Sequence, residues 1–132
     1  MKEYQHTTRV RYAETDKMGV VYHANYAIYF EIGRVEWLRN RGISYKEMEE
    51  QGIMLPVVSL SMSYKKSAYY DDLLTIVTRL KNLNAIRIEF EYEILNQHNE
   101  LLTTGETTLV FINSQTKRPT PAPKHILSKL EQ

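Results

Sequence analysis

The residues of this chain best suited to chemistry lie in one stretch, residues 12–26. Asp16 supplies a carboxylate in a segment that contains Gly19 and lacks a sustained hydrophobic period, which predicts a loop. His23 follows, just before a helical pattern that begins around Asn25. Because a helix start presents unpaired backbone N–H groups and partial positive charge, it can stabilise charge that develops on a carbonyl oxygen.

A carboxylate beside such a helix start has two reasonable roles. Asp16 would face the carbonyl carbon while the backbone amides around His23 and Ala24 polarise the carbonyl oxygen. It would act as a general base that activates water, or as a nucleophile that forms a mixed anhydride which water then cleaves. Thioesters suit both routes, since a thiolate leaves readily. The sequence leaves the two routes open.

Each of these residues also has a structural interpretation. A single aspartate in a loop is typical of a turn or capping residue, and a histidine at a helix start is often bonded to a neighbour. For His23 we therefore expect a role through the backbone amide rather than through the ring. Asn25 is interpreted as a helix N-cap and Glu31 as a residue of the polar helix face. Arg34, near Glu31, is expected to be solvent-exposed as well.

The elements that position this stretch follow from the hydrophobic periods. Residues 4–12 alternate as in a strand, and a wide apolar stripe predicts a long, largely buried helix from Asn25 to about Gly42. Gly33 in mid-helix indicates a close approach to a sheet. A short helix is expected at residues 44–51 and another at 125–130, with strands at 55–66, 73–80, 86–94 and 101–112 and a turn at 96–99. The predicted fold is one α+β domain, residues 1–132, with an antiparallel sheet over one helix.

Composition narrows the class of protein. A net charge of +1 gives no reason to expect nucleic acid binding, and the absence of cysteine excludes disulfides, thiolate catalysis and Cys-type zinc sites. The four histidines are scattered, so no metal site is expected. No signal peptide or membrane span is evident, and we expect a cytoplasmic protein. One sheet over one helix leaves an edge uncovered, which favours self-association.

Residues 11–26, read as Arg-Tyr-Ala-Glu-Thr-Asp-Lys-Met-Gly-Val-Val-Tyr-His-Ala-Asn-Tyr, together with residues 30–36 and 63–74, resemble the 4-hydroxybenzoyl-CoA thioesterase superfamily, most closely its YbgC-like acyl-CoA thioesterase branch. The resemblance implies a hotdog fold, dimers and commonly tetramers, active sites at subunit interfaces, and an acyl-CoA substrate with no separate cofactor. It implies that Asp16 is the catalytic aspartate and that the His23 amide polarises the carbonyl. Tyr22 and Asn25 match positions that shape the site.

The chain departs from this family at one point. Lys17 and Met18 stand where the aromatic-substrate branch often has Pro-Ala, which favours a short-chain or general acyl group over 4-hydroxybenzoyl. Four basic residues at predicted strand ends are candidates for the coenzyme A phosphates, although each also fits ordinary surface charge. They are Lys65, Lys66, Lys81 and Arg87.

Two other functions remain open from the sequence. A hotdog dehydratase would use a histidine and an acid on a hydroxyacyl thioester, but here the acid Asp16 precedes His23 in a short loop and no second acid is placed for that chemistry. A non-catalytic module that binds acyl thioesters would keep the fold without needing Asp16.

Overall fold

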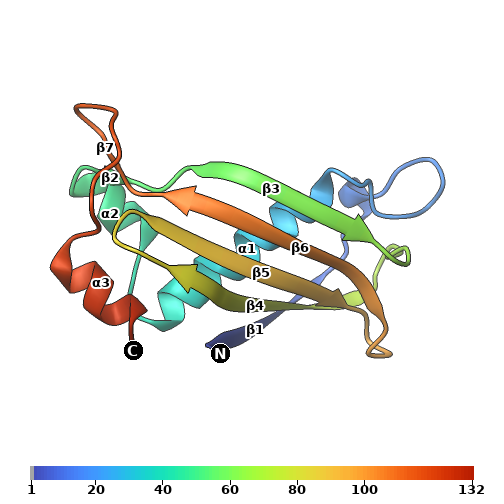
Figure 1. Cartoon of the computed structure of the whole chain (residues 1–132). Coiled ribbons are helices and arrows are strands. Elements are labelled where there is room, and N and C mark those ends of the chain that lie inside the picture. The colour runs from blue at the N-terminus through green and yellow to red at the C-terminus, as the bar shows by residue number, and fades with distance from the viewer. Residues whose placement is uncertain (1) are drawn as a thin grey trace.

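The computed structural model describes residues 2–132 and places one antiparallel five-stranded sheet across one long helix (Figure 1). In chain order the elements are β1 (Glu3–Arg9), the 3-10 helix η1 (Tyr12–Glu14), α1 (Asn25–Asn40), α2 (Tyr45–Glu50), β2 (Ile53–Met54), β3 (Val57–Tyr64), β4 (Leu73–Leu83), β5 (Arg87–Leu95), β6 (Leu101–Val110), β7 (Ile112–Asn113) and α3 (Lys124–Leu130). The strand order is β1-β4-β5-β6-β3, and β2 pairs with β7 separately. The predicted α+β arrangement is confirmed.

Helix α1 lies close to the sheet at two glycines, one on the helix and one on the sheet. A Cβ atom on Gly33 would come within 2.7 Å of Cγ2 of Ile76 and even nearer to Oγ1 of Thr78, both on β4. On β6, a Cβ atom on Gly105 would overlap the ring of Phe30. The close approach predicted from Gly33 is therefore confirmed.

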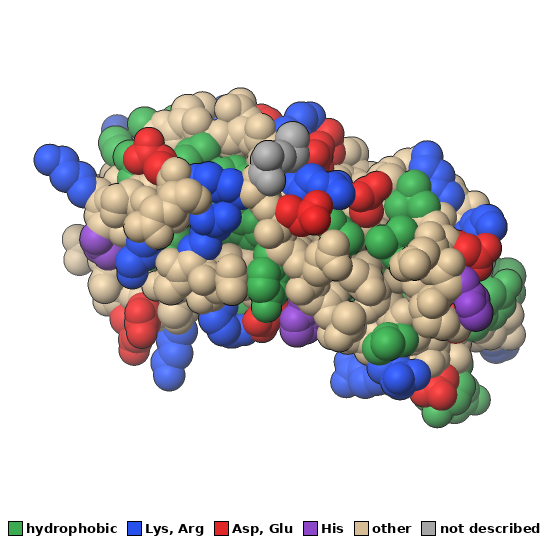
Figure 2. Space-filling model, turned by 90° about the horizontal axis from the view of Figure 1, so that it is seen from below, with side chains coloured by type: hydrophobic (Ala, Val, Ile, Leu, Met, Phe, Trp, Pro, Cys, Tyr) green, Lys and Arg blue, Asp and Glu red, His purple; other side chains and the backbone are tan. Residues whose placement is uncertain are grey.

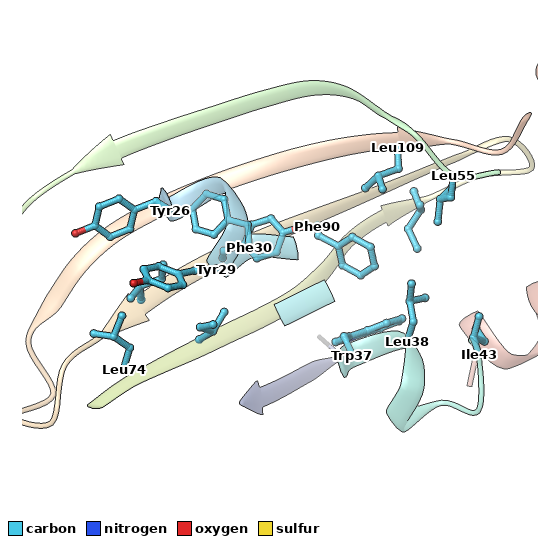
Figure 3. Packing of buried hydrophobic residues seen from close by; sticks show 14 of the residues in the cluster. Tyr26, Tyr29, Phe30, Trp37, Leu38, Ile43, Leu55, Leu74, Phe90 and Leu109 are labelled. Atoms are coloured by element: carbon cyan, nitrogen blue, oxygen red, sulfur yellow. The ribbon is translucent and has the colours of Figure 1, made fainter. Parts of the chain in front are cut away.

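An aromatic layer fills the space between α1 and the sheet (Figure 3). Phe30 stacks on Tyr92 with 4.4 Å between ring centroids, and Trp37 meets Phe90 edge-on at 5.1 Å. The buried Tyr92 hydroxyl shares a 2.6 Å hydrogen bond with Thr107. Since burying a large apolar side chain contributes about 1.5–3 kcal/mol, this layer fixes the helix against the sheet.

Several predicted boundaries differ from the structure. The first strand ends at Arg9 instead of residue 12, because Tyr12 begins η1. The strand expected at residues 101–112 divides into β6 and β7, and the strand expected at 55–66 is the shorter β3. The turn at residues 96–99 is confirmed, with Asn99 at φ 59°. No helix in the described residues is both long and apolar enough to cross a membrane.

The prediction that the Arg34 side chain is solvent-exposed is wrong. Its exposed fraction is only 8%, whereas Glu31, one turn earlier, is exposed as expected. Residues of α2 and of the segment leading into β3, including Tyr45 and Leu55, cover this side of α1. A short helix packed beside α1, which the apolar stripe does not reveal, therefore buries the guanidinium.

The helix-to-sheet contact can be tested with Gly33→Ala. Although alanine favours a helix by about 1 kcal/mol over glycine, overpacking against β4 costs typically 1–3 kcal/mol, so we expect a net loss of unfolding free energy in urea. Adding Thr78→Ala should restore part of the loss, because it removes the nearest atom. A Gly33→Ala protein as stable as the parent would contradict the close contact.

Candidate active site

The segment between η1 and α1 forms a narrow turn that carries Asp16. Thr15 pairs with Val21, and the Asp16 N–H donates to the carbonyl oxygen of Val20 at 2.9 Å. Gly19 closes the turn with φ 81°, a left-handed conformation that glycine adopts without strain. The predicted loop is confirmed, and it is held by its own backbone hydrogen bonds.

The connection between β3 and β4 supports this turn from one side. The Val21 N–H donates to the carbonyl oxygen of Ala68 at 2.8 Å, and Val20 forms a bridge with Tyr69. In Figure 1 the turn and this connection lie at the same end of the molecule, where α1 begins and β3 ends. Residues about fifty positions apart in the chain therefore meet beside Asp16.

Glu14 ties the turn to the start of α1. Its carbonyl oxygen accepts hydrogen bonds from the Tyr22 N–H at 2.9 Å and from Nδ2 of Asn25 at 2.8 Å. Its carboxylate accepts from the Tyr29 hydroxyl at 2.7 Å, the Arg11 N–H at 3.0 Å and Arg11 Nε at 2.9 Å. Burial alone would raise the pKa of Glu14, but the hydrogen bonds from Arg11 and Tyr29 outweigh burial and lower it. Glu14 is therefore a charged anchor for the turn.

The prediction that Asn25 is the helix N-cap is wrong. Helix α1 begins at Asn25 itself, with Ala24 in the cap position, and the Asn25 side chain is committed to Glu14. The first helical amides are satisfied locally, since the N–H groups of Asn25 and Tyr26 donate to the carbonyl oxygens of Tyr22 and His23 at 2.9 and 3.3 Å. The N–H groups of His23 and Ala24 have no acceptor within residues 2–132.

Asp16 and His23 line one cavity of about 280 Å³. Oδ1 of Asp16 accepts a hydrogen bond from the Met18 N–H at 2.8 Å, while Oδ2 accepts none from the described residues. The Tyr64 hydroxyl, at the end of β3, donates to the carbonyl oxygen of His23 at 3.2 Å. The remaining lining residues are Val20, Val21, Tyr26, Lys65, Lys66 and Ser67. The cavity is thus lined both by the Asp16 carboxylate, which has one oxygen without a hydrogen bond from the described residues, and by His23 near the start of α1.

The predicted phosphate ligands separate into two pairs. Lys65 and Lys66 line the cavity, where Nζ of Lys65 donates to Ser63 at 3.1 Å and Nζ of Lys66 pairs with Glu100 at 2.7 Å. Lys81 instead pairs with Glu106 at 2.7 Å, and Arg87 begins β5. Neither Lys81 nor Arg87 lines the cavity.

Tyr22 stands next to the cavity without lining it. Its ring lies 4.5 Å from that of His23, and 47% of the residue is exposed. The buried Tyr26 forms part of the wall. Its pKa is raised, mainly by burial, so the hydroxyl stays protonated. The aromatic wall therefore contributes shape and hydroxyl groups, and the negative charge comes from Asp16.

The charged side chains on the face shown in Figure 2 are mixed, with basic and acidic groups interspersed. Among residues 2–132, no three His, Asp or Glu side chains come together as a set of metal ligands. The lysine side chains that line the Asp16 cavity are those of Lys65 and Lys66.

Comparisons with known proteins agree on one family. Residues 10–130 match the model of the thioesterase-like superfamily. The acyl-CoA thioester hydrolase YbgC of Escherichia coli is 32% identical over 94% of this chain and 92% of its own, and YneP of Bacillus subtilis is 36% identical over 83% and 80%. The crystal structure of a DHNA-CoA thioesterase from Staphylococcus aureus superposes with a TM-score of 0.93, at 39% identity, over 99% of this chain and 92% of that one.

The anchoring role of Glu14 predicts a pH-dependent effect of Glu14→Gln. Because the folded-state pKa of Glu14 is depressed, its contribution to stability is present above the ordinary pKa, near 4.3, and is lost as the pH falls through the folded value. The variant should be less stable than the parent at neutral pH by about 1–3 kcal/mol in urea unfolding, and the gap should narrow below about pH 4. A gap that does not change with pH would rule out the charged anchor.

Proposed function

The chain belongs to the thioesterase-like superfamily, and on that premise we propose that it hydrolyses acyl-coenzyme A thioesters to a free acid and coenzyme A. Its sheet and helix form the hotdog fold of the matching thioesterase structure. The observation that carries the proposal is the cavity that Asp16 and His23 line together, at the start of α1 where the His23 N–H has no acceptor among residues 2–132.

In the proposed reaction the thioester carbonyl oxygen accepts hydrogen bonds from the N–H groups of His23 and Ala24. These donors are fixed by the helix, so they stabilise the negative charge of the tetrahedral intermediate without reorganising. As a general base, Asp16 takes a proton from water while the water oxygen bonds to the carbonyl carbon. As a nucleophile, Asp16 bonds to that carbon itself and water later cleaves the anhydride. In both routes the C–S bond breaks, and the sulfur leaves as a thiolate that takes up a proton.

Oδ2 of Asp16 is the atom that this chemistry needs. Since Oδ1 is held by the Met18 N–H, the carboxylate has a fixed orientation and one oxygen left for water or substrate. Among residues 2–132 no other Asp or Glu lines the cavity, which gives a dehydratase no second acid there. These contacts favour hydrolysis over water elimination.

Lys65 and Lys66 are the proposed ligands of the coenzyme A phosphates. Both lie at the exposed rim of the Asp16 cavity, where an ammonium group pairs readily with phosphate oxygens. Lys66 would exchange its exposed pair with Glu100 for the phosphate, a change that costs little because surface ion pairs are weak. A phosphate-binding role for Lys81 and Arg87 stays a prediction, and within one chain these two residues lie outside the cavity.

The proposal includes a dimer formed through the edge strand β3. All but one of its residues are exposed, among them Val58 at 56% and Leu60 at 44%. The neighbouring face of α1 adds Ile28 at 51%. A long, exposed, apolar edge strand has unpaired backbone groups that pair readily with another strand. Tetramers and a cytoplasmic location stay predictions.

The catalytic role of Asp16 is tested by release of free thiol from a panel of acyl-CoA esters. Asp16→Asn keeps the size of the side chain and removes its charge, so kcat/KM should fall by roughly 10²–10⁴-fold. Asp71→Asn is a matched control, since Asp71 is exposed, lies outside the cavity and has φ 70°, which asparagine tolerates. Equal hydrolysis by the parent and Asp16→Asn would refute the assignment.

The proposed dimer is tested by Val58→Lys. Lysine on an edge strand opposes strand pairing, so the variant should sediment as a monomer at concentrations where the parent is a dimer. Gln5→Lys places the same charge on β1, the other edge of the sheet, and should leave the dimer intact. If Gln5→Lys dissociates the protein and Val58→Lys does not, the interface has been placed on the wrong edge.

A further inference from the structure

Tyr64 lines the Asp16 cavity, but its hydroxyl has no role in the proposed reaction. It is the last residue of β3, and Figure 1 shows that β3 ends at the end of the molecule where α1 begins. The Tyr64 hydroxyl donates a hydrogen bond to the carbonyl oxygen of His23 at 3.2 Å. A side chain from the sheet therefore bonds directly to the backbone of the helix start.

The Tyr64 hydroxyl carries one proton, and the His23 carbonyl oxygen is the better of its two acceptors. The other acceptor is the sulfur of Met62 at 3.6 Å, and a thioether accepts hydrogen bonds only weakly. Two edge-on ring contacts hold the Tyr64 ring, with centroids 5.5 Å from that of Tyr26 and 6.4 Å from that of His23. Since Tyr26 and His23 also line the cavity, packing within its wall directs the Tyr64 hydroxyl at the helix start.

The helix by itself holds the His23 carbonyl group only loosely. At the start of α1 the backbone bonds span three residues, and the Tyr26 N–H reaches the His23 carbonyl oxygen at 3.3 Å. The bond from the Ala27 N–H to the Ala24 carbonyl oxygen is equally long. Both exceed the usual N–H···O length of about 2.9–3.0 Å. The Tyr64 hydroxyl is therefore a second anchor for a carbonyl group that the helix bonds weakly.

The anchored carbonyl belongs to the same peptide group as the N–H of Ala24. A trans peptide group is planar, and its C=O and N–H point in opposite directions. A hydrogen bond to the His23 carbonyl oxygen fixes this plane, and it draws electron density from the nitrogen, which makes the Ala24 N–H a stronger donor. Since that N–H has no acceptor within residues 2–132, a group that binds there receives the stronger hydrogen bond.

We propose that Tyr64 is a positioning residue of the hydrolysis, whose hydroxyl orients and polarises the His23–Ala24 peptide group so that its N–H stabilises the oxyanion. This inference rests on the proposed function, because the oxyanion is that of the thioester. The N–H bond strengthens as the thioester oxygen gains negative charge, so Tyr64 lowers the reaction barrier more than it strengthens substrate binding. Tyr64 acts through the peptide group and needs no contact with the thioester.

The test compares Tyr64→Phe with the parent in single-turnover hydrolysis of esters from acetyl-CoA to palmitoyl-CoA, with benzoyl-CoA included. Phenylalanine keeps the ring contacts and removes only the hydroxyl of a residue that is 49% exposed. The rate constant at saturating enzyme should fall about three- to tenfold, and the half-saturating concentration should stay within about twofold, as expected for one hydrogen bond that acts on the transition state. Tyr70→Phe is the control, because Tyr70 is exposed outside the cavity, and it should keep the parent rate.

An infrared measurement separates polarisation from packing. The ester that the parent hydrolyses fastest, labelled with ¹³C at the thioester carbonyl, is bound to the Asp16→Asn protein, which keeps it intact. Adding Tyr64→Phe should raise the carbonyl stretching frequency, because a weaker N–H donor leaves the C=O bond stronger. If the ring alone mattered, Tyr64→Phe would match the parent and only Tyr64→Leu, which also removes the ring, would be impaired.

Equal rates and equal carbonyl frequencies with and without the Tyr64 hydroxyl would overturn the inference, and so would a loss confined to the half-saturating concentration. Because Tyr64 belongs to β3, the rates are compared at a concentration where parent and variant sediment as the same species. A parent that hydrolyses no ester of the panel would refute the proposed function, and this result is seen before any Tyr64 variant is measured.

Discussion

The charged Glu14 carboxylate, held between Arg11 and Tyr29, is the interaction on which the site depends. Its hydrogen bonds fix η1 against α1, and its carbonyl oxygen fixes Tyr22 and Asn25 at the start of the helix. With both ends of the turn held, Asp16 has little freedom to leave the helix start. Catalysis by fixed donors needs this kind of rigidity, because a loose amide would have to reorganise during the reaction.

A second constraint acts at the middle of α1. Gly33 lets the helix approach β4, and Gly105 lets Phe30 approach β6, so the helix packs over the middle of the sheet. Strand β3 remains at the edge of the sheet, and a hollow of about 210 Å³ lies between it and α1. The contact that stabilises the fold therefore also fixes the helix whose start lines the Asp16 cavity.

The sequence predicts the elements that have a clear period. The alternation before Arg9, the apolar stripe of α1 and the turn before β6 are all visible in it, and Gly33 indicates the close packing correctly. The position of Asp16 before a helix start was also predictable. For Lys65 and Lys66, which line the same cavity, the sequence indicates only candidate phosphate ligands, since a cation at a strand end is most often surface charge.

Other parts depend on contacts between distant residues and carry little local signal. Tyr64 reaches His23 from forty-one positions away, and α2 buries Arg34 on what the helical pattern marks as a polar face. The sequence contains a weak signal for the anchoring role of Glu14, because Glu14 follows Arg11 at the three-residue spacing of a capping box. Asparagine favours the N-cap position, so the sequence predicts that role for Asn25, whereas in the structure its amide group donates to the carbonyl oxygen of Glu14 across the turn.

The most direct test of the central claim is a crystal structure with a stable acyl-CoA analogue in which a methylene group replaces the thioester sulfur. We expect its carbonyl oxygen within about 3 Å of the N–H groups of His23 or Ala24, and its carbonyl carbon facing Oδ2 of Asp16, directly or through one water molecule. A carbonyl group bound elsewhere, with the helix-start amides and Asp16 not in contact with it, would contradict the account.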